Sequence, residues 1–99
     1  SRRLMKAGDI IAYQHHEKWD GSGYPQGLKA EEIHIYARIV AIADVLDALT
    51  HVRVYKEPWD FDAASHYIIE RKGTQFDPYL VKLFEENLES FRKIIEEKN

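Results

Sequence analysis

The sequence contains no cysteine, and none of its hydrophobic runs is long enough to cross a membrane. The absence of cysteine excludes disulfide bonds and thiolate metal sites, so His, Asp and Glu are the only strong metal ligands in the chain. The absence of a long apolar run excludes a membrane span. Because we also find no secretory signal, we expect a cytoplasmic protein with no membrane partner.

Positive charge is not in excess either. The chain carries 14 basic and 17 acidic residues, for a net charge of −3, and the basic residues are scattered. Such a chain lacks the basic surface that binds a long nucleic acid, although a small phosphate ligand is still compatible with it. Its 99 residues, of which 44% are hydrophobic, can form one modest core. We therefore expect a single folded domain or a part of one.

The periodicity of the apolar residues is helical, and no segment has a convincing strand pattern. Asp60, and Asp77 followed by Pro78, are typical of the start of a helix. The predicted helices cover residues 2–17, 35–51, 60–70 and 78–95. The predicted fold class is therefore all-α, with about four helices.

A segment rich in glycine, DGSGYPQGL at 20–28, interrupts the helical pattern. Its three glycines and one proline favour tight turns and positive φ angles, and they oppose both helix and strand. Loops between helices often carry functional residues, so this segment is part of the candidate site.

Asp44 lies in the segment 35–51, which is apolar on two sides. One apolar stripe of this helix points away from Asp44, yet the residues one turn from Asp44 are also valine or alanine. We therefore predict that Asp44 is a buried carboxylate, which needs a cation beside it. That cation is either Arg38 or Arg53 in a structural ion pair, or a metal ion.

An adjacent histidine pair, His15 and His16, lies near the predicted end of the first helix. Neighbouring side chains point about 100° apart on a helix, but at its end both imidazoles can reach one cavity. Two imidazoles and a carboxylate suit Fe, Mn or Zn, and a two-metal centre can activate hydroxide against a phosphodiester. Glu17 and Asp47 are candidates to accept imidazole N–H bonds, with surface charge as the alternative interpretation.

Three ordered segments of the sequence resemble the HD-GYP family of metal-dependent phosphohydrolases. They are HHEKWDGSGYPQGL at 15–28, ARIVAIADVLDALTHVRVYK at 37–56 and GTQFDP at 73–78. Together they cover nearly the whole chain, whereas a GYP triplet alone would be uninformative. Because that family hydrolyses the bacterial second messenger cyclic di-GMP to pGpG and GMP, the resemblance implies a phosphodiesterase in bacterial signal transduction.

The resemblance also implies the metal centre. It implies that the chain supplies three of the ligands, which are His15, His16 and Asp44. The complete domain would hold two or three divalent ions, with Fe or Mn favoured and Zn as an alternative.

Further residue roles follow from the same resemblance. It implies phosphate contacts from Arg53 and Lys56, because guanidinium and ammonium groups both suit phosphate oxygens, and the alternative is a solvated loop charge. The naming triplet shapes the site and contacts partners in the family, and it consists of Gly23, Tyr24 and Pro25.

The sequence departs from the family pattern at several points. Ala30 stands where the family usually has Gly, and His34 stands where it has Pro, so a different turn is expected after the loop. The HD dyad that names the family lies in its N-terminal half and is absent from these residues. We therefore predict that residues 1–99 are an excised C-terminal part of a single HD-GYP domain, inactive in isolation. An uncovered apolar side of the segment 35–51 would then favour a homodimer or a domain-swapped assembly.

Two other functions compete with this one, of which the first stays open and the second fails. In one, the chain is a non-catalytic signalling module whose GYP loop docks a diguanylate cyclase domain of the GGDEF type. The other is an oxygen-binding di-iron bundle of the hemerythrin kind, which the HHE triplet suggests. The remaining histidines argue against that second function because each has a different local setting; they are His34, His51 and His66.

Overall fold

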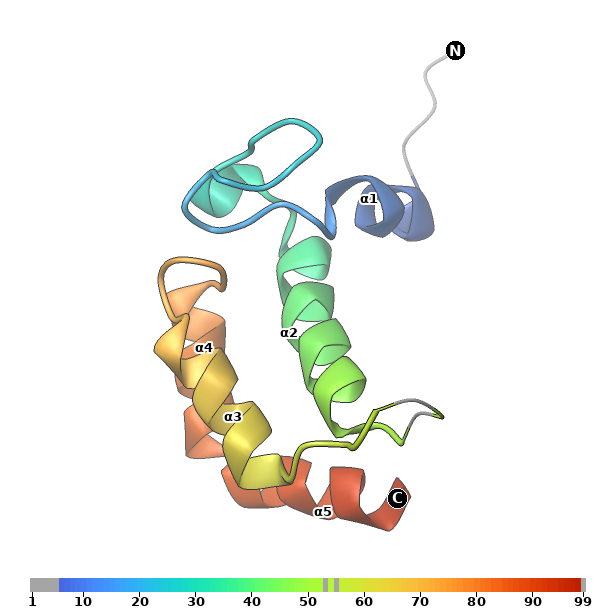
Figure 1. The fold of residues 1–99 in the computed structure, drawn as a ribbon. Coiled ribbons are helices and arrows are strands. Elements are labelled where there is room, and N and C mark those ends of the chain that lie inside the picture. The colour runs from blue at the N-terminus through green and yellow to red at the C-terminus, as the bar shows by residue number, and fades with distance from the viewer. Residues whose placement is uncertain (1–5, 53, 55, 99) are drawn as a thin grey trace.

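The computed structural model describes residues 6–98 except 53 and 55, and these form five α-helices and one short 3-10 helix (Figure 1). The elements are α1 (Ala7–Gln14), η1 (Ala30–Glu32), α2 (Ile35–Thr50), α3 (Phe61–Glu70), α4 (Pro78–Glu86) and α5 (Leu88–Lys98). The described residues form no β-strand, only isolated bridges such as the one between Lys72 and Phe76. The predicted all-α class is confirmed. In this part of the chain, no helix combines the length and the apolar character that a membrane crossing requires.

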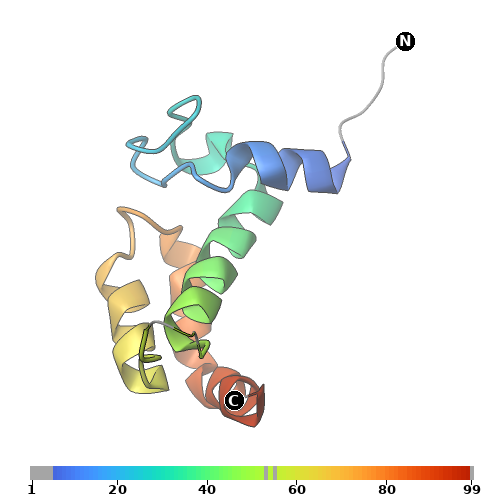
Figure 2. The same ribbon diagram turned by 45° about the vertical axis from the view of Figure 1, so that its right-hand side comes forward.

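Helix α2 is the central element of the fold. Figures 1 and 2 show α1 and its following loop at the N-terminal end of α2, α3 and α4 beside α2, and α5 near its C-terminal end. The core lies between α2, α3 and α4, and burial of one of its large side chains contributes roughly 1.5–3 kcal/mol. It contains Ile42, Leu46, Phe61, Ala64, Ile68, Phe76, Val81 and Phe84. Since α1 contributes nothing to this core, it and the loop depend on other contacts for their position.

Two helix starts are confirmed at the level of single hydrogen bonds. The Asp60 carboxylate accepts from the Ala63 amide at 2.8 Å at the start of α3. The Asp77 carboxylate accepts from the Tyr79 amide at 2.8 Å, and Pro78 is the first residue of α4. These caps satisfy amide groups that the first turn of a helix leaves without partners.

The prediction of one continuous helix after Asp77 is wrong. The chain leaves helical geometry at Asn87, with φ −127° and ψ 28°, and α5 begins at the next residue. The Asn87 side-chain amide donates to the Leu83 carbonyl at 2.8 Å. Asparagine side chains compete with backbone amides for such carbonyls, which explains the break at a position where the apolar periodicity continues.

The turn after the loop keeps a left-handed residue where the family has glycine. Ala30 has a φ of 54°, and its amide donates to the Trp19 carbonyl at 2.8 Å. His34 supplies a bond that proline could not make, because its backbone N–H donates to the Gln14 side-chain oxygen at 2.7 Å. Ala30 thus keeps a left-handed residue in the turn, whereas the His34 bond joins the end of α1 to the start of α2.

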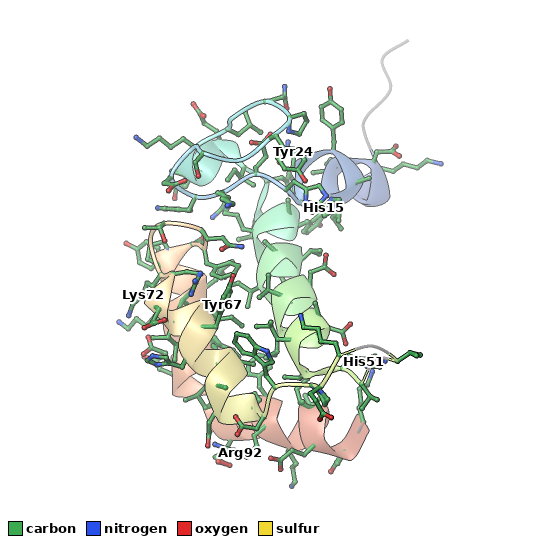
Figure 3. The ribbon with its side chains drawn as sticks, viewed as in Figure 1. His15, Tyr24, His51, Tyr67, Lys72 and Arg92 are labelled. Carbon is green, nitrogen blue, oxygen red and sulfur yellow. The ribbon has the colours of Figure 1, made fainter. Side chains whose placement is uncertain are left out.

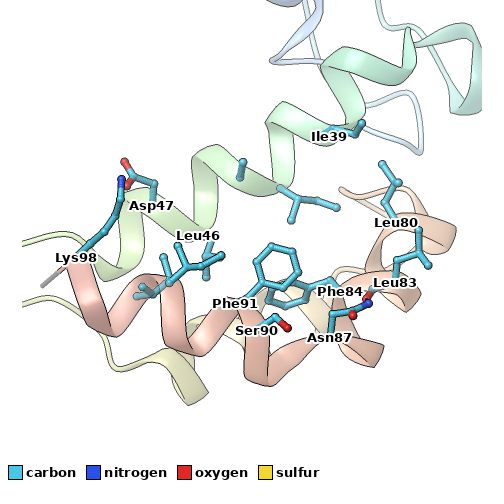
Figure 4. Close-up of a pocket in the computed structure, with 14 residues that line it drawn as sticks. Ile39, Leu46, Asp47, Leu80, Leu83, Phe84, Asn87, Ser90, Phe91 and Lys98 are labelled. Carbon is cyan, nitrogen blue, oxygen red and sulfur yellow. The ribbon is translucent and has the colours of Figure 1, made fainter.

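An apolar groove of about 620 Å³ lies between α2, α4 and α5 (Figure 4). Its exposed apolar side chains include Ile39, Leu83 and Ile94, each with about half of its surface accessible (49%, 55% and 54%). An exposed apolar surface of this kind favours association. The described residues therefore leave α2 partly uncovered, although the uncovered apolar residues border α4 and α5.

We predict that Ala30→Gly stabilises the protein. A left-handed alanine costs roughly 1–2 kcal/mol, and glycine loses roughly 0.4–1 kcal/mol of backbone entropy in return, so a net gain of about 0.5–1 kcal/mol is expected. Urea unfolding followed by circular dichroism measures this change. Ala43→Gly, at an exposed position inside α2, is the matched control and should destabilise by about 1 kcal/mol. A lower free energy of unfolding for Ala30→Gly would contradict the left-handed geometry.

We also predict that the 99-residue chain associates with itself through the groove as its concentration rises. Leu83→Asp should reduce association because it places a charge among apolar contacts, whereas Lys82→Asp, on the neighbouring exposed position, should not. Sedimentation velocity over a range of concentrations measures both effects. A wild-type chain that stays monomeric at every concentration would contradict this prediction.

Candidate functional site

The two predicted histidines follow directly after α1. The helix ends at Gln14, about three residues earlier than predicted, and His15 is its C-cap. The Nδ1 atom of His15 lies 2.9 Å from the Ile11 carbonyl oxygen. A carbonyl can only accept, so Nδ1 carries the proton and a neutral ring keeps the lone pair of Nε2 for a ligand. A backbone partner of this kind is typical of metal-binding histidines.

The predicted metal ligands line one cavity of about 420 Å³ between the HHE segment (residues 15–17), the GYP loop (residues 20–28) and α2. His15 and His16 come from the end of α1, with ring centroids 3.9 Å apart, and Asp44 comes from the middle of α2. The structure therefore brings to one cavity three side chains that are up to 29 positions apart (44 − 15).

The predicted burial of Asp44 is wrong. Asp44 and the neighbouring Ala48 are both exposed, because no described segment covers this side of α2. The periodicity correctly identified small apolar neighbours, but periodicity alone does not show what covers them. Asp44 is a carboxylate on the wall of an open cavity, so it does not require a cation for burial.

Arg38 does not pair with Asp44, which excludes one of the two structural ion pairs. Its Nη1 atom donates to Asp77 Oδ2 at 2.7 Å, and its Nε atom donates to the Ile33 carbonyl at 2.8 Å. The side chain of Asp77 is only 2% exposed. The other candidate partner, Arg53, lies outside the described residues.

Glu17 is buried, so its interpretation as a surface charge is wrong. It is 4% exposed, and its two carboxylate oxygens accept from backbone amides of the loop, Gln26 N at 2.8 Å and Leu28 N at 2.9 Å. Glu17 was expected to accept an imidazole N–H bond, and it accepts amides of the loop instead. A sequence signal for this role existed, since a glycine-rich loop exposes amides that need acceptors.

The GYP loop packs directly on the HHE segment. A Cβ at Gly23 would lie 2.4 Å from the His16 carbonyl oxygen and 2.5 Å from the Lys18 amide, so only glycine fits there. Tyr24, which precedes a cis peptide bond to Pro25, stacks on the His16 ring with centroids 4.8 Å apart and an interplanar angle of 18°. The loop is thus one wall of the histidine cavity.

Asp20, at the start of the loop, accepts hydrogen bonds from within the loop itself. The Ser22 hydroxyl and amide both donate to Asp20 Oδ1, at 2.6 and 3.0 Å. These bonds hold the pKa of the Asp20 carboxyl below its ordinary value. Asp20 is exposed and does not line the cavity.

Two other predicted residues, Asp47 and Lys56, are not brought to this cavity. Asp47 lines the apolar groove on another face of α2, where Figure 4 shows it beside Lys98. Lys56 is exposed and does not line the histidine cavity. It follows His51, which Figure 3 shows at the opposite end of α2 from His15 and Tyr24. Arg53 again lies outside the described residues.

Two cavity residues were missed by the sequence analysis. Lys18 and Gln75 both line the histidine cavity. The segment around Gln75 is attached to the start of the loop, because the Asp20 amide donates to the Thr74 carbonyl at 2.9 Å. The signal for Gln75 was its place in the segment 73–78, one of the three segments that carry the family resemblance.

The donor atoms of this cavity fit a divalent metal in their chemistry, since imidazole nitrogen and carboxylate oxygen are ligands for Fe, Mn and Zn. Within the described residues, no three His, Asp or Glu side chains are arranged so that they hold one ion. The chain therefore offers ligands on one wall of a site, and a complete coordination sphere needs further donors.

A family model described as HD domain matches residues 2–80. This match includes the HHE segment, the GYP loop, α2 and α3, so it covers every residue of the histidine cavity.

Curated relatives are similar over most of this chain. The cyclic di-GMP phosphodiesterase response regulator RpfG of Xanthomonas campestris is 53% identical over 79 residues, which are 80% of this chain and 21% of that protein. The 3'3'-cGAMP-specific phosphodiesterase 2 of Vibrio cholerae is 49% identical over 90 residues, or 91% of this chain and 17% of that protein. The chain spans about a fifth of the length of these relatives.

A solved structure has the same fold over most of the chain. The crystal structure of a cyclic GMP-AMP-specific phosphodiesterase of V. cholerae superposes with a TM-score of 0.71 at 30% identity. The match covers 88% of this chain and 20% of that chain.

Proposed function

We propose that this chain, which belongs to the HD domain family and within it to the HD-GYP group, is the C-terminal part of a metal-dependent phosphodiesterase domain that hydrolyses cyclic di-GMP. The observation that carries the proposal is the shared cavity of His15, His16 and Asp44. The names of the similar proteins support a phosphodiesterase of cyclic dinucleotides, RpfG with cyclic di-GMP and the V. cholerae enzyme with 3'3'-cGAMP, and they argue against a purely non-catalytic module.

His15, His16 and Asp44 are the residues that would hold the metal, and further ligands would come from the part of the domain that contains the HD dyad. Bound divalent ions would supply Lewis-acid activation of water and neutralise phosphate charge. Fe or Mn is the proposed metal, in two or three sites, and the donor set also accepts Zn. The role of this chain is to orient its imidazoles for metal binding, as the Ile11 carbonyl orients the imidazole of His15.

Cyclic di-GMP carries phosphodiester groups that need cationic neighbours. Lys18 borders the cavity, and we propose that Arg53 and Lys56 add phosphate contacts in the complete domain. Tyr24 is 60% exposed while its ring stacks on His16, so its free face is suited to a guanine base. Hydrolysis would yield pGpG and then GMP. Because cyclic di-GMP is a bacterial second messenger, we propose a cytoplasmic location for the protein.

Docking of a GGDEF domain on the GYP loop is a further proposal for a partner. The loop is exposed at Tyr24, Pro25 and Gln26, which leaves surface for contact. Since Tyr24 also contacts His16, a docked partner would act on the hydrolytic site and would not replace it.

We predict that His16→Ala in the full-length protein that carries this chain reduces hydrolysis of cyclic di-GMP by well over a hundredfold. The loss of a metal ligand exceeds the roughly 10- to 100-fold loss that follows from removing a ligand's hydrogen-bond partner. Chromatographic assay of pGpG and GMP measures the change. His66→Ala is the matched control, because His66 is exposed and pairs with Glu70 away from the cavity. Undiminished turnover in His16→Ala would refute the mechanism.

We predict that the 99-residue chain alone binds Mn²⁺ weakly and hydrolyses no cyclic di-GMP. The reason is that its described residues do not complete a coordination sphere. Isothermal titration with Mn²⁺, and the same product assay, measure both properties. Turnover by the chain alone, abolished by chelation, would contradict the proposal that the site needs the rest of the domain.

A further inference from the structure

The carboxylate of Glu17 is buried without an ion pair among the described residues. Burial of a charge costs several kcal/mol unless strong hydrogen bonds replace water. Here the replacement comes from two backbone amides of the loop, Gln26 N at 2.8 Å and Leu28 N at 2.9 Å. Charge-assisted bonds of this kind are about twice as strong as neutral ones, so they attach the loop firmly.

These bonds act together with contacts at the other side of the loop. Gly23 lies against the backbone of residues 16–18, and the Tyr24 amide donates to the His16 carbonyl at 3.2 Å. The loop backbone is therefore held at Gly23 and Tyr24 by the backbone of the HHE segment, and at Gln26 and Leu28 by the Glu17 side chain.

His16 differs from His15 in how its ring is held. His15 has a hydrogen bond to a carbonyl, whereas no hydrogen bond among the described residues involves the His16 ring. The contacts of that ring are aromatic: His15 at 3.9 Å and Tyr24 at 4.8 Å between centroids. The near-parallel Tyr24 ring is consequently one of two ring contacts that favour an orientation of His16, and it is the one that comes from the loop.

We propose that Glu17 is a positioning residue that holds the loop so that Tyr24 orients the His16 imidazole in the cavity. This inference rests on the proposed function in one respect, because it assigns the oriented ring to metal binding. Glu17 thus acts on the imidazole indirectly, through the loop and Tyr24, and not through the expected bond from an imidazole N–H.

The chemistry of the side chain explains why a carboxylate is needed. Two converging N–H groups require two acceptor oxygens, which Glu provides. In Glu17→Gln one oxygen becomes an NH₂ donor that faces another donor, at nearly unchanged volume. Glu17→Gln therefore breaks one loop bond without opening a cavity in the core.

The first experiment uses nuclear magnetic resonance on the full 99-residue chain. In Glu17→Gln we expect faster hydrogen exchange at the Gln26 or Leu28 amide and a shift of the His16 ring protons. Tyr24→Leu should shift the same ring protons because it removes the stacked ring, and Tyr24→Phe should preserve them. His16 ring signals that stay unchanged in both Glu17→Gln and Tyr24→Leu would overturn the proposal.

The second experiment measures Mn²⁺ affinity and kcat in the full-length protein. Glu17→Gln and Tyr24→Leu should each lower one or both by roughly 10- to 100-fold, with Tyr24→Phe close to wild type. Asp60→Ala is the control, because the Asp60 carboxylate also accepts a backbone amide, at the start of α3, and lies outside the histidine cavity. It should lower thermal stability without lowering the activity of the folded protein.

The outcomes separate the two proposals. If Glu17→Gln changes only thermal stability, as Asp60→Ala is expected to do, the residue is merely structural and the inference fails. If the wild-type full-length protein hydrolyses no cyclic dinucleotide, the proposed function fails. In that case the resonance experiment still decides whether Glu17 and Tyr24 orient His16.

Discussion

The ion pair between Arg38 and Asp77 joins segments that are far apart in the sequence. Asp77 also caps α4, and Arg38 also donates to the Ile33 carbonyl before α2. Because the Asp77 side chain is almost inaccessible to water, loss of its partner would cost roughly 3–5 kcal/mol. This one buried charge therefore sets where the segment before α4 meets the start of α2. The cavity wall at Gln75, two residues earlier in the chain, depends on the same junction.

Glu17 is also a buried carboxylate, and different partners satisfy its hydrogen-bonding capacity. Asp77 finds a guanidinium and an amide, whereas Glu17 finds two amides of the GYP loop. Both solutions satisfy a buried carboxylate, and both place a loop beside the histidine cavity. The core between α2, α3 and α4 supplies the apolar burial, and these two acids determine how the loops that form the site are attached to it.

An open site follows from this arrangement. The histidine cavity has α2 on one side and the loop on another, and Asp44 is exposed on its wall. The apolar groove lies on a separate face, so the chain has two incompletely covered surfaces of different character. A cavity that carries potential metal ligands suits a ligand site, while an apolar groove suits a packing partner.

Sequence patterns determined those features that depend on neighbours along the chain. Helix starts at Asp60 and Asp77 were predictable because a cap forms within three residues, and the span of α2 followed from its apolar period. The break at Asn87 was not predictable, since a side chain there competes with the backbone while the apolar period continues. The likeness to HD-GYP proteins supplied the candidate ligands, which local pattern alone left ambiguous.

Only the tertiary structure decided which charged groups meet. It paired Arg38 with Asp77 and not with Asp44, directed Glu17 to the loop, and placed Asp47 on a different face from the histidines. The physical reason is that burial and ion pairing depend on what covers a helix face, which periodicity does not contain. The sequence by itself thus determined the helices and the types of chemical group available, and the packing of loops on α2 decided which of them share a site.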